Sequence, residues 1–488
     1  MSGGRQVGPH TREWVLGPDT EYRFELDPGT SLAIKLVRGR AEVFGAELVE
    51  GKTLLFAYEA KAAVFTWHGC TLEVTGAPST EYVADETPMA AYANVHVALE
   101  KMRVRAQEPE PASDDNEPPR VLVLGPENSG KTTVCKILAN YAVRAGQGWE
   151  PLYINVDPSE GGWTVPGTIS AASITVPIPT ASPATPLGNA ATSSASTLAA
   201  NALTPLVYWY GHADTKRNPL LLERLIRNLG ENVGERQDND PEGRLAGIII
   251  DTPSSFASST TSGADHRLTL IRACVDAFRI NVILVVGHEK LNVEMQRTYG
   301  NRMSVVKIPK SGGVVELDSS YRHRVQTAQI HNYMYGQAFS PPQGLGPLVQ
   351  ATPGGEAALE QRLAPSSQVV SVEDLVIYRI GEESMAPTSA LPIGATRTVS
   401  ELVPVRLDPT QPGARLHSAL LALMHQSAED AERYDEELLD MQVAGFLALT
   451  GVDAKARKMT VLAPTPIPFG GGPARVAIVG SFEWTEQS

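Results

Sequence analysis

Cysteine is scarce in this chain of 488 residues, which contains only Cys70, Cys135 and Cys274. Their odd number and wide separation argue against a disulfide framework and against a zinc site. Long apolar runs are also missing, because no stretch of ~18 apolar residues occurs that would span a membrane. The N-terminal stretch MSGGRQVGPHTREW has no apolar core of the kind found in a signal peptide. These absences predict a protein of a reducing compartment, either the cytosol or the nucleus.

Positive charge is in short supply as well, since the formal net charge is -14. Proteins that grip nucleic acid over their whole surface are usually basic. Any contact with RNA is therefore expected to be local or made through a partner. The guanine-recognition pattern N-K-x-D is absent too, which leaves a GTPase-type switch without support.

The composition that remains is ordinary for a globular protein, with 42% hydrophobic and 20% charged residues. At ~150 residues per domain, the length leaves room for about three domains. Residues 20–105 are predicted to form short strands, because Leu32, Ile34 and Leu36 alternate with other residues and turn signals recur. Such evenly punctuated strands favour an antiparallel sandwich over residues 1–105.

A second type of pattern begins after an acidic, proline-rich linker at 106–119. The apolar runs VLVL, PLYINV, LAGIIID and NVILVVG are typical of buried parallel strands, and a helix is predicted around Leu268–Phe278. Buried strands that alternate with helices indicate an α/β domain over 120–340. Residues 175–204 and 231–244 are expected to be surface loops within it.

A third unit is predicted over 369–488, after a Pro/Gly-rich linker at 341–368. It contains a helix candidate, LHSALLALMHQ, and the strand candidates VAGFLALTG and ARVAIVGSFEW. The expected fold class is therefore α/β. A central P-loop domain with a parallel sheet is preceded by an N-terminal β-sandwich and followed by a small C-terminal α/β domain.

The most informative stretch is VLVLGPENSGKTTVCKILANYAVR at 121–144, which contains G-x-x-x-x-G-K-T. A strand is predicted before this motif and a helix after it, as a phosphate-binding loop requires. In such a loop the glycines let the backbone curl, and its N–H groups and the helix N-terminus face phosphate oxygens. We expect Lys131 to reach the β- and γ-phosphates and the Thr132 hydroxyl to bind Mg²⁺. The predicted ATP-binding residues of this stretch are Gly125, Asn128, Ser129, Gly130, Lys131, Thr132 and Thr133.

Two aspartates follow predicted strands of the same domain. Asp157 ends the stretch YINVD and Asp251 ends GIIID. Acidic residues at the C-terminal ends of such strands lie where ligands bind, so both are candidates for a position near Mg²⁺. The alternative is that either aspartate only caps a loop or a helix.

Several longer stretches together resemble the Clp-one (Clp1) family, the subunit of the mRNA cleavage and polyadenylation machinery that is related to polynucleotide 5′-hydroxyl kinases. They are RFELDPGTSLAIKLVRGRAEVFGAEL, AKAAVFTWHGCTLEV, GPENSGKTTVCKIL, VPGTISA, SGGVVE and VAGFLALTGVD. The resemblance covers essentially the whole chain, and the family fold agrees with the three predicted domains.

The resemblance adds expectations that spacing alone does not provide. It implies that the sandwich closes over ATP, with Glu21 at the adenine and Lys61 beside the nucleotide. Without it, both would be taken for solvated charges on strand edges. It also implies a Pcf-eleven (Pcf11) type partner docked largely on the central domain, other cleavage and polyadenylation subunits as further partners, and a nuclear location.

Active kinases of this family need further residues around the phosphates, and this chain departs from them in three places. The base position is retained as Asp157, but the glutamine that follows it in active relatives is replaced by Glu160, which would repel phosphate. The RNA-clasping tryptophan is absent near Ser255, and stacking on a base is worth ~1–3 kcal/mol.

The third departure lies in the lid helix after SGGVVE. Arg322 and Arg324 remain, whereas the later arginine positions are Gln326, Gln329 and His331. Loss of one arginine at the transition state can cost ~10³–10⁵ in rate. The favoured hypothesis is therefore an ATP-bound scaffold required for endonucleolytic cleavage before polyadenylation, as in fungal members. The alternative is an active RNA 5′-hydroxyl kinase that uses Asp157, Lys131 and the two remaining arginines.

Overall fold

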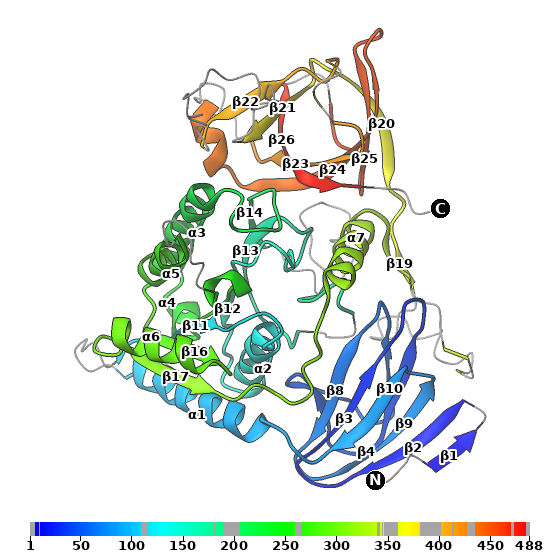
Figure 1. The fold of residues 1–488 in the computed structure, drawn as a ribbon, viewed down its shortest axis with the longest axis vertical. Helices are drawn as coiled ribbons and strands as arrows, with labels where there is room; N and C mark the ends of the chain where they lie inside the picture. Colours follow the sequence, from blue (N-terminus) through cyan, green and yellow to red (C-terminus); the bar gives the residue numbers. More distant parts are fainter. Residues whose placement is uncertain are drawn as a thin grey trace, which may run out of the picture.

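The computed structural model describes most of the chain. The described residues are 5–8, 10–108, 116–178, 182–188, 205–258, 266–338, 342–343, 345, 360–380, 402–411, 414, 416–426, 435–469 and 473–484. They form a sandwich, a central mixed sheet with helices on both faces, and a C-terminal sheet (Figure 1). The predicted domain limits stay predictions, although the three units they delimit are present.

The N-terminal unit is a β-sandwich, as predicted. Its two sheets have the strand orders β1-β2-β9-β4-β7 and β10-β3-β8-β5-β6. Leu32, Ile34 and Leu36 are buried between them, together with Tyr22 and Phe24. The strands are β1 (Arg5–Gly8), β2 (Thr11–Leu16), β3 (Thr20–Glu25), β4 (Leu32–Gly39), β5 (Glu42–Val43), β6 (Ala46–Glu47), β7 (Thr53–Phe56), β8 (Lys61–Thr66), β9 (Cys70–Gly76) and β10 (Thr80–Ala84).

The prediction of strands up to residue 105 is wrong in its last part, because Met89–Ala106 form helix α1. Met89, Tyr92 and Leu99 are buried and join the core of the central domain rather than that of the sandwich. Their spacing of three and seven residues places them on one face of a helix, and Pro88 is the last proline before it. The helix thus leads from the sandwich along the outside of the central domain (Figure 1).

The central sheet has the order β14-β13-β12-β15-β11-β16-β17, and its five strands from β12 to β17 run parallel. Strands β13 and β14 extend it antiparallel. All four predicted strands of this domain are present. The strands are β11 (Arg120–Leu124), β12 (Leu152–Asn155), β13 (Thr168–Ser173), β14 (Leu206–Trp209), β15 (Ile248–Asp251), β16 (Val282–Val286) and β17 (Ser304–Ile308).

Helices cover both faces of this sheet because successive strand residues point to opposite sides. Val121 and Val123 pack in the cluster of α1 and α2, whereas Leu122 and Leu124 pack in the cluster of α3 and α5. The predicted helix around 268–278 is α5. The helical elements are α2 (Lys131–Arg144), α3 (Pro219–Asn239), α4 (Pro241–Leu245), the 3₁₀ turn η3 (Ser254–Phe256), α5 (His266–Ala277), α6 (Glu289–Tyr299) and α7 (Ser319–Tyr335).

One of the two loops expected in this domain is helical. Residues 231–239 continue α3, and Asp240 caps α4 through its bond to the Gly243 N–H group. The segment is polar on its outer face, but Leu229, Val233 and Gln237 keep the buried stripe at helical spacing. Of the other expected loop, 179–181 and 189–204 lie outside the described residues. Its described part has no helix or strand, yet Ile178 is buried.

The C-terminal unit is a sheet of order β20-β25-β24-β23-β26-β21-β22. The predicted helix LHSALLALMHQ is wrong, since Ala419–Met424 form strand β23 in its interior. Leu420 and Met424 face the central domain, and Leu421 and Leu423 face the unit's own core. A strand buried on both faces is apolar throughout, so its hydrophobic pattern cannot be distinguished from that of a buried helix.

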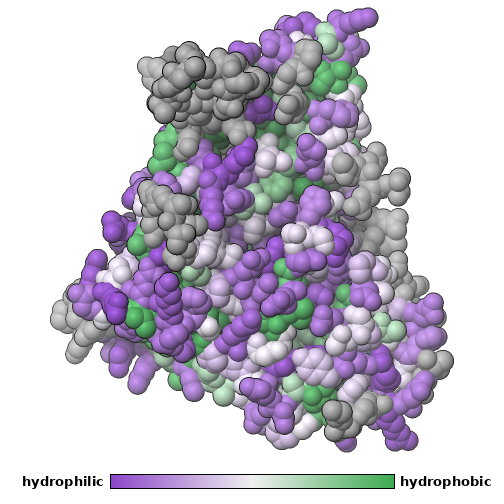
Figure 2. Space-filling view, viewed as in Figure 1, coloured by the Kyte–Doolittle hydropathy of each residue, from purple (hydrophilic) through white to green (hydrophobic). Residues whose placement is uncertain are grey.

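In its described residues, this part of the chain contains eight further strands and one 3₁₀ turn. The strands are β18 (Gly336–Ala338), β19 (Glu360–Arg362), β20 (Ser366–Ser371), β21 (Leu375–Ile380), β22 (Pro404–Leu407), β24 (Val443–Asp453), β25 (Lys458–Ala463) and β26 (Arg475–Glu483), with the 3₁₀ turn η8 (Asp435–Asp440). Strand β20 begins inside the predicted linker 341–368. The face in Figure 2 is mostly hydrophilic, with apolar side chains in small separate groups. Among the described residues, no helix is long and apolar enough to cross a membrane.

Candidate functional site

The motif G-x-x-x-x-G-K-T forms a tight loop between β11 and α2. Gly130 has φ +87° and ends the loop, and Asn128 has φ +52°. A Cβ atom at Gly125 would lie 2.7 Å from the Ser129 hydroxyl oxygen, so this position needs glycine. The helix then starts at Lys131 with no side-chain cap on its first N–H groups. These groups are free to face an anion at the positive end of the helix.

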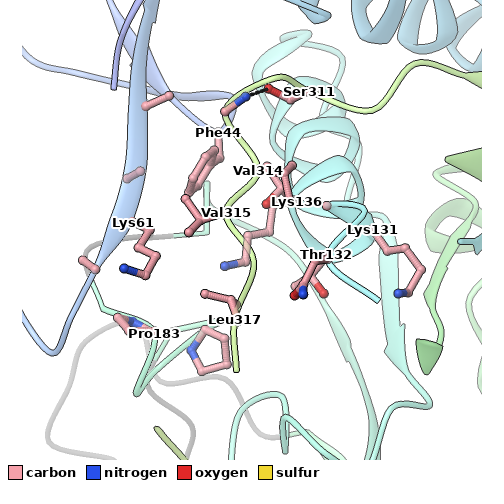
Figure 3. Close-up of a pocket in the computed structure, with 18 of the residues that line it drawn as sticks. Phe44, Lys61, Lys131, Thr132, Lys136, Pro183, Ser311, Val314, Val315 and Leu317 are labelled. Atoms are coloured by element: carbon pink, nitrogen blue, oxygen red, sulfur yellow. Dashed lines mark hydrogen bonds between the residues drawn. The ribbon is translucent and has the colours of Figure 1, made fainter. Parts of the chain in front are cut away.

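Lys131 and the two threonines after it line a cavity of about 330 Å³. Lys131 is 8% exposed, and its ammonium group donates to the Pro126 carbonyl at 3.2 Å across the loop. The cavity also takes in Glu127, Asn128, Ser129 and Gly130 of the loop, whereas the predicted Gly125 lies outside its lining. The structure therefore brings together six of the seven predicted loop residues around one space (Figure 3): Asn128, Ser129, Gly130, Lys131, Thr132 and Thr133.

Asp251 ends β15 directly beside the start of α2. One of its carboxylate oxygens accepts a bond from the Tyr153 hydroxyl at 3.3 Å, and the other is buried without a donor among the described residues. Burial raises the pKa of Asp251 to about 6, while the Thr132 hydroxyl and Lys131 act in the opposite direction. In the described part of the chain, no backbone N–H group donates to this carboxylate, so a capping role is not what the structure shows.

This arrangement fits Mg²⁺ beside a bound nucleotide. An orphaned carboxylate oxygen next to the Thr132 hydroxyl offers oxygen ligands, which Mg²⁺ prefers. No group of three His, Cys, Asp or Glu side chains that could hold a metal occurs in the described part of the chain. The ion would therefore depend on phosphate oxygens and water for its remaining ligands.

Asp157 follows β12 and lines the same cavity. One of its oxygens accepts from the Ser159 backbone N–H at 2.9 Å and from the Ser159 hydroxyl at 2.7 Å. Asp157 thus closes a turn, as the alternative interpretation predicted, while it also faces the cavity.

Glu160 brings a further negative charge to this side. Burial, followed by the charges of Asp157 and Asp251, raises the pKa of Glu160 to about 7, and Lys131 and Lys136 oppose the shift. Glu160 thus lies among other carboxylates and two lysines, and its repulsion of phosphate stays a prediction.

The lid helix α7 is joined to the phosphate loop by Arg322. Its guanidinium group lies 2.9 Å from the Glu127 carboxylate and donates to the Asn128 side-chain oxygen at 2.7 Å. Arg322 also lines the cavity. Of the two predicted lid arginines, it is the one in the site.

Arg324 points away from the cavity, so the prediction that it could serve catalysis does not agree with the geometry. It forms two bonds of 2.8 and 2.7 Å to the Glu59 carboxylate of the sandwich. Tyr321 adds a bond from its hydroxyl to the Glu59 carbonyl at 3.4 Å. His331 lies further along α7, where its ring stacks on Tyr335.

Two glutamines stand where the lid arginines were expected. Gln326 donates to the Ser159 carbonyl at 2.9 Å, and Gln329 donates to the Glu160 carbonyl at 2.8 Å. Both line the cavity and tie α7 to the turn after β12. Their amide groups are neutral, so they supply no positive charge to a transferring phosphoryl group.

The position of the absent tryptophan is occupied by small side chains of η3. The Thr215 and Ser255 hydroxyl oxygens lie 2.8 Å apart in a hydrogen bond, and the neighbouring Ser254 lines the cavity. Phe256, the aromatic residue of this turn, is fully buried. No ring of η3 is therefore available to stack on a base.

The sandwich closes the other side of the cavity. Glu21 is 4% exposed, and its carboxylate accepts from Arg23 at 2.7 Å and from the Thr87 hydroxyl. Lys61 donates to Glu25 at 3.1 Å and lies 5.6 Å above the Tyr321 ring of the lid. Both predicted sandwich residues line the cavity. Neither is the solvated charge on a strand edge that would have been assumed without the resemblance.

Sequence reasoning missed four charged residues that line the cavity: Arg23, Glu25, Glu127 and Lys136. Arg23 and Glu25 belong to the sandwich and reach the site only through the packing of two domains, which no local pattern reveals. Lys136 had a signal, because it lies one helical turn after Thr132 in the helix that the motif starts.

Three family models match the chain. They are described as the mRNA cleavage and polyadenylation factor CLP1 P-loop (residues 125–336), the N-terminal beta-sandwich domain of polyadenylation factor (15–106) and pre-mRNA cleavage complex II protein Clp1 (363–486). Together they span all three units described above.

Relatives match along the full length of the chain. The mRNA cleavage and polyadenylation factor CLP1 of Laccaria bicolor is 64% identical over 98% of each chain. The CLP1 homolog of Arabidopsis thaliana is 34% identical over 100% of this chain and 97% of its own.

Solved structures agree with this result. A complex of wild-type Clp1p with a Pcf11p fragment matches with a TM-score of 0.77 at 25% identity, over 98% of this chain and 99% of that one. A second solved structure matches with the same TM-score. It describes an extended interface between Pcf11p and Clp1p and the loss of ATP in a glycine-to-arginine point mutant.

Proposed function

The chain belongs to the Clp1 family of mRNA cleavage and polyadenylation factors, and we propose that it is an ATP-holding scaffold of the pre-mRNA 3′-end cleavage machinery. In this role the nucleotide fixes the arrangement of the domains. The chain acts in the nucleus, where it supports endonucleolytic cleavage before polyadenylation. A Pcf11-type subunit docks on it, as Pcf11p does on the similar Clp1p.

One observation carries the proposal: the cavity at the phosphate loop is closed by three separate parts of the chain. The sandwich contributes Glu21 and Lys61, the loop contributes Lys131, and the lid contributes Arg322. A ligand that touches all three binds only when they are assembled. By mass action it stabilises that assembly by RT ln(1 + [L]/Kd), about 4 kcal/mol at 1,000 times Kd.

The polar groups around the cavity suit ATP with Mg²⁺. The loop N–H groups and Lys131 would hold the phosphates, and Thr132 with Asp251 would hold the ion. When bound, Mg²⁺ neutralises phosphate charge close to the carboxylates. Glu21, held by Arg23 and Thr87, faces the cavity from the sandwich and would accept from the amino group of adenine.

The lid supports retention of ATP rather than its turnover. Arg322 is already engaged by Glu127 and Asn128 of the loop, and Arg324 is held by Glu59 outside the cavity. Gln326 and Gln329 bring no charge. With one lid arginine in the cavity, transition-state stabilisation is weak relative to a lid with several.

An active RNA 5′-hydroxyl kinase is the second candidate, and a specific observation favours it. Asp157, the base position, and Arg322 line the same cavity as Lys131. A base, a phosphate-binding lysine and one arginine therefore remain together.

The decisive experiment measures transfer of labelled γ-phosphate to a 5′-hydroxyl RNA oligonucleotide, together with the nucleotide released when the purified protein is denatured. We expect ATP to be recovered and no transfer to occur. Lys131→Ala is the control, and it should yield protein with little nucleotide. Transfer that disappears in Lys131→Ala would overturn the scaffold proposal in favour of the kinase. Wild-type protein that purifies without nucleotide and does not bind added ATP would overturn both.

A further inference from the structure

Lys136 is a buried lysine of α2 that the loop motif does not include. It is 8% exposed and lines the cavity. Among the described residues, its ammonium group has neither a hydrogen bond nor an ion pair. Lys131 differs, because it bonds the Pro126 carbonyl of its own loop.

A charged group without a partner is unfavourable on a side chain that is largely buried, so the position of Lys136 at the cavity needs an explanation. Burial lowers the pKa of Lys136 to about 8, although the charges of Glu160 and Asp251 act in the opposite direction. The side chain therefore sits where an incoming anion would stabilise its charge. The anion expected in this cavity is the nucleotide.

Helix geometry indicates which part of the nucleotide Lys136 would meet. Lys136 lies four residues after Thr132, one turn further along the same face of α2. Side chains of a helix lean towards its N-terminus, so the ammonium group reaches back towards the phosphate loop. Figure 3 shows it extending towards the side of Lys61 and Val315, away from Lys131. It thus lies between the loop and the sandwich wall.

We propose that Lys136 binds the α-phosphate of the nucleotide, whereas Lys131 binds the terminal phosphates. This inference rests on the proposed ATP site and adds a residue to it. The α-phosphate joins the phosphates held by the loop to the adenosine that the sandwich covers. A cation placed between loop and sandwich meets that group and not the γ-phosphate.

A simpler role for Lys136 would be to offset the charge of Glu160. The two are coupled electrostatically, since each shifts the pKa of the other. That role requires no contact with the nucleotide. The two roles make different predictions when Glu160 is neutral.

The test uses the full-length protein, stripped of nucleotide, and measures its affinity for ATP, ADP and AMP by calorimetric titration. Lys136→Met should weaken all three by a similar factor of about ten or more, since each contains an α-phosphate and a charge-assisted bond is lost. Lys131→Met should weaken ATP and ADP far more than AMP. Lys136→Arg should keep most of the affinity.

The double variant Lys136→Met/Glu160→Gln separates the two roles. If Lys136 binds phosphate, the double variant should bind ATP about tenfold or more weakly than Glu160→Gln alone. Equal affinity of these two proteins would overturn the proposal, as would a loss confined to ATP. Lys136→Gln provides the same comparison if the methionine variant does not fold. Wild-type protein that binds no ATP would overturn the proposed function itself, whereas ATP binding unchanged by Lys136→Met would overturn only the role of Lys136.

Discussion

Three carboxylates converge at the ends of two neighbouring strands, and their charges oppose one another. Asp157 and Glu160 follow β12, and Asp251 ends β15. Burial and mutual repulsion raise the pKa of Glu160 to about 7 and that of Asp251 to about 6. Without a bound metal ion, the folded protein therefore keeps a proton on Glu160 up to about pH 7, whereas the unfolded chain releases it near pH 4.5.

This difference makes a prediction for Glu160→Gln. Because the pKa of Glu160 is higher in the folded state, its contribution to the free energy of unfolding falls as pH rises from about 4.5 to about 7. In nucleotide-free protein the variant should be more stable than wild type at pH 8, by about 1–3 kcal/mol. At pH 4 the two should be similar. Urea unfolding between pH 4 and pH 8 measures this, and a variant less stable at pH 8 would contradict it.

The site residues that could be located without the family resemblance belong to one continuous motif or stand at the end of a strand. Lys131, Thr132 and Asp251 follow directly from a loop and a strand end whose geometry is known in advance. Lys136 falls just beyond the pattern, one helical turn after Thr132. Arg23 and Glu59 were not predictable, since their roles arise from contacts with residues far away in the chain.

Among the elements, α7 connects the sandwich, the loop and the turn after β12. Its bonds to Glu59 on one side and to Asn128 and Ser159 on the other hold it over the cavity. We expect the release of a ligand beneath the helix to require some of these contacts to open. The contact with Glu59 lies outside the cavity, so it can be changed without touching the ligand site.

We therefore predict that Glu59→Gln speeds the release of ATP by about three- to tenfold, with little change in the association rate. The side chain of Glu59 is 13% exposed, and its two bonds to Arg324 hold the lid more firmly than a fully exposed pair would. Stopped-flow chase of a fluorescent ATP analogue measures the rate.

Glu289→Gln is the matched control for this measurement. It removes the carboxylate of an exposed ion pair with Lys307 on α6 and β17, away from the cavity. Its release rate should equal that of wild type. If Glu59→Gln also releases the analogue at the wild-type rate, α7 does not limit release.

Helices and strands were predicted correctly where their hydrophobic pattern allowed only one interpretation. The parallel strands of the central sheet are bounded by turns and are short, so their length excludes helices. Strand β23 and helix α1 were assigned wrongly for opposite reasons. Strand β23 is apolar on both faces, so it resembles a buried helix. Helix α1 has a single buried face, and the residues that cover it belong to a domain that comes later in the chain.

At the scale of the whole molecule, the three units are joined in two different ways. The C-terminal sheet shares an apolar core with the central domain, where Phe446 packs on Trp209 at 5.4 Å between ring centroids. The sandwich has a core of its own and, among its described residues, adds only Phe65, with Phe44 and Trp67 packed beside it, to the central core. Polar contacts, such as those of Glu42 with Tyr141 and Arg144, complete this junction. The cavity at the phosphate loop lies at this second junction, because both the sandwich and the central domain contribute to its lining.

This difference predicts how the molecule unfolds. Phe446→Ala should lower the stability of the central and C-terminal units together by about 3–5 kcal/mol, because they share one core. Without nucleotide, the sandwich should unfold in a separate transition that this variant does not move. Scanning calorimetry resolves the two transitions, and Phe56→Ala, in the sandwich core, identifies the other one.

If ATP contacts both sides of the junction, as we propose, it binds only when they are assembled, so saturating ATP should bring the two transitions together. The expected result is a single transition at higher temperature for wild type and two transitions for Lys131→Ala, whose cavity lacks the main phosphate-binding group. If ATP raises the central transition and leaves that of the sandwich in place, the nucleotide does not hold the domains together. The ligand would then be bound by the central domain alone, and the scaffold would have to be stabilised by its protein partners.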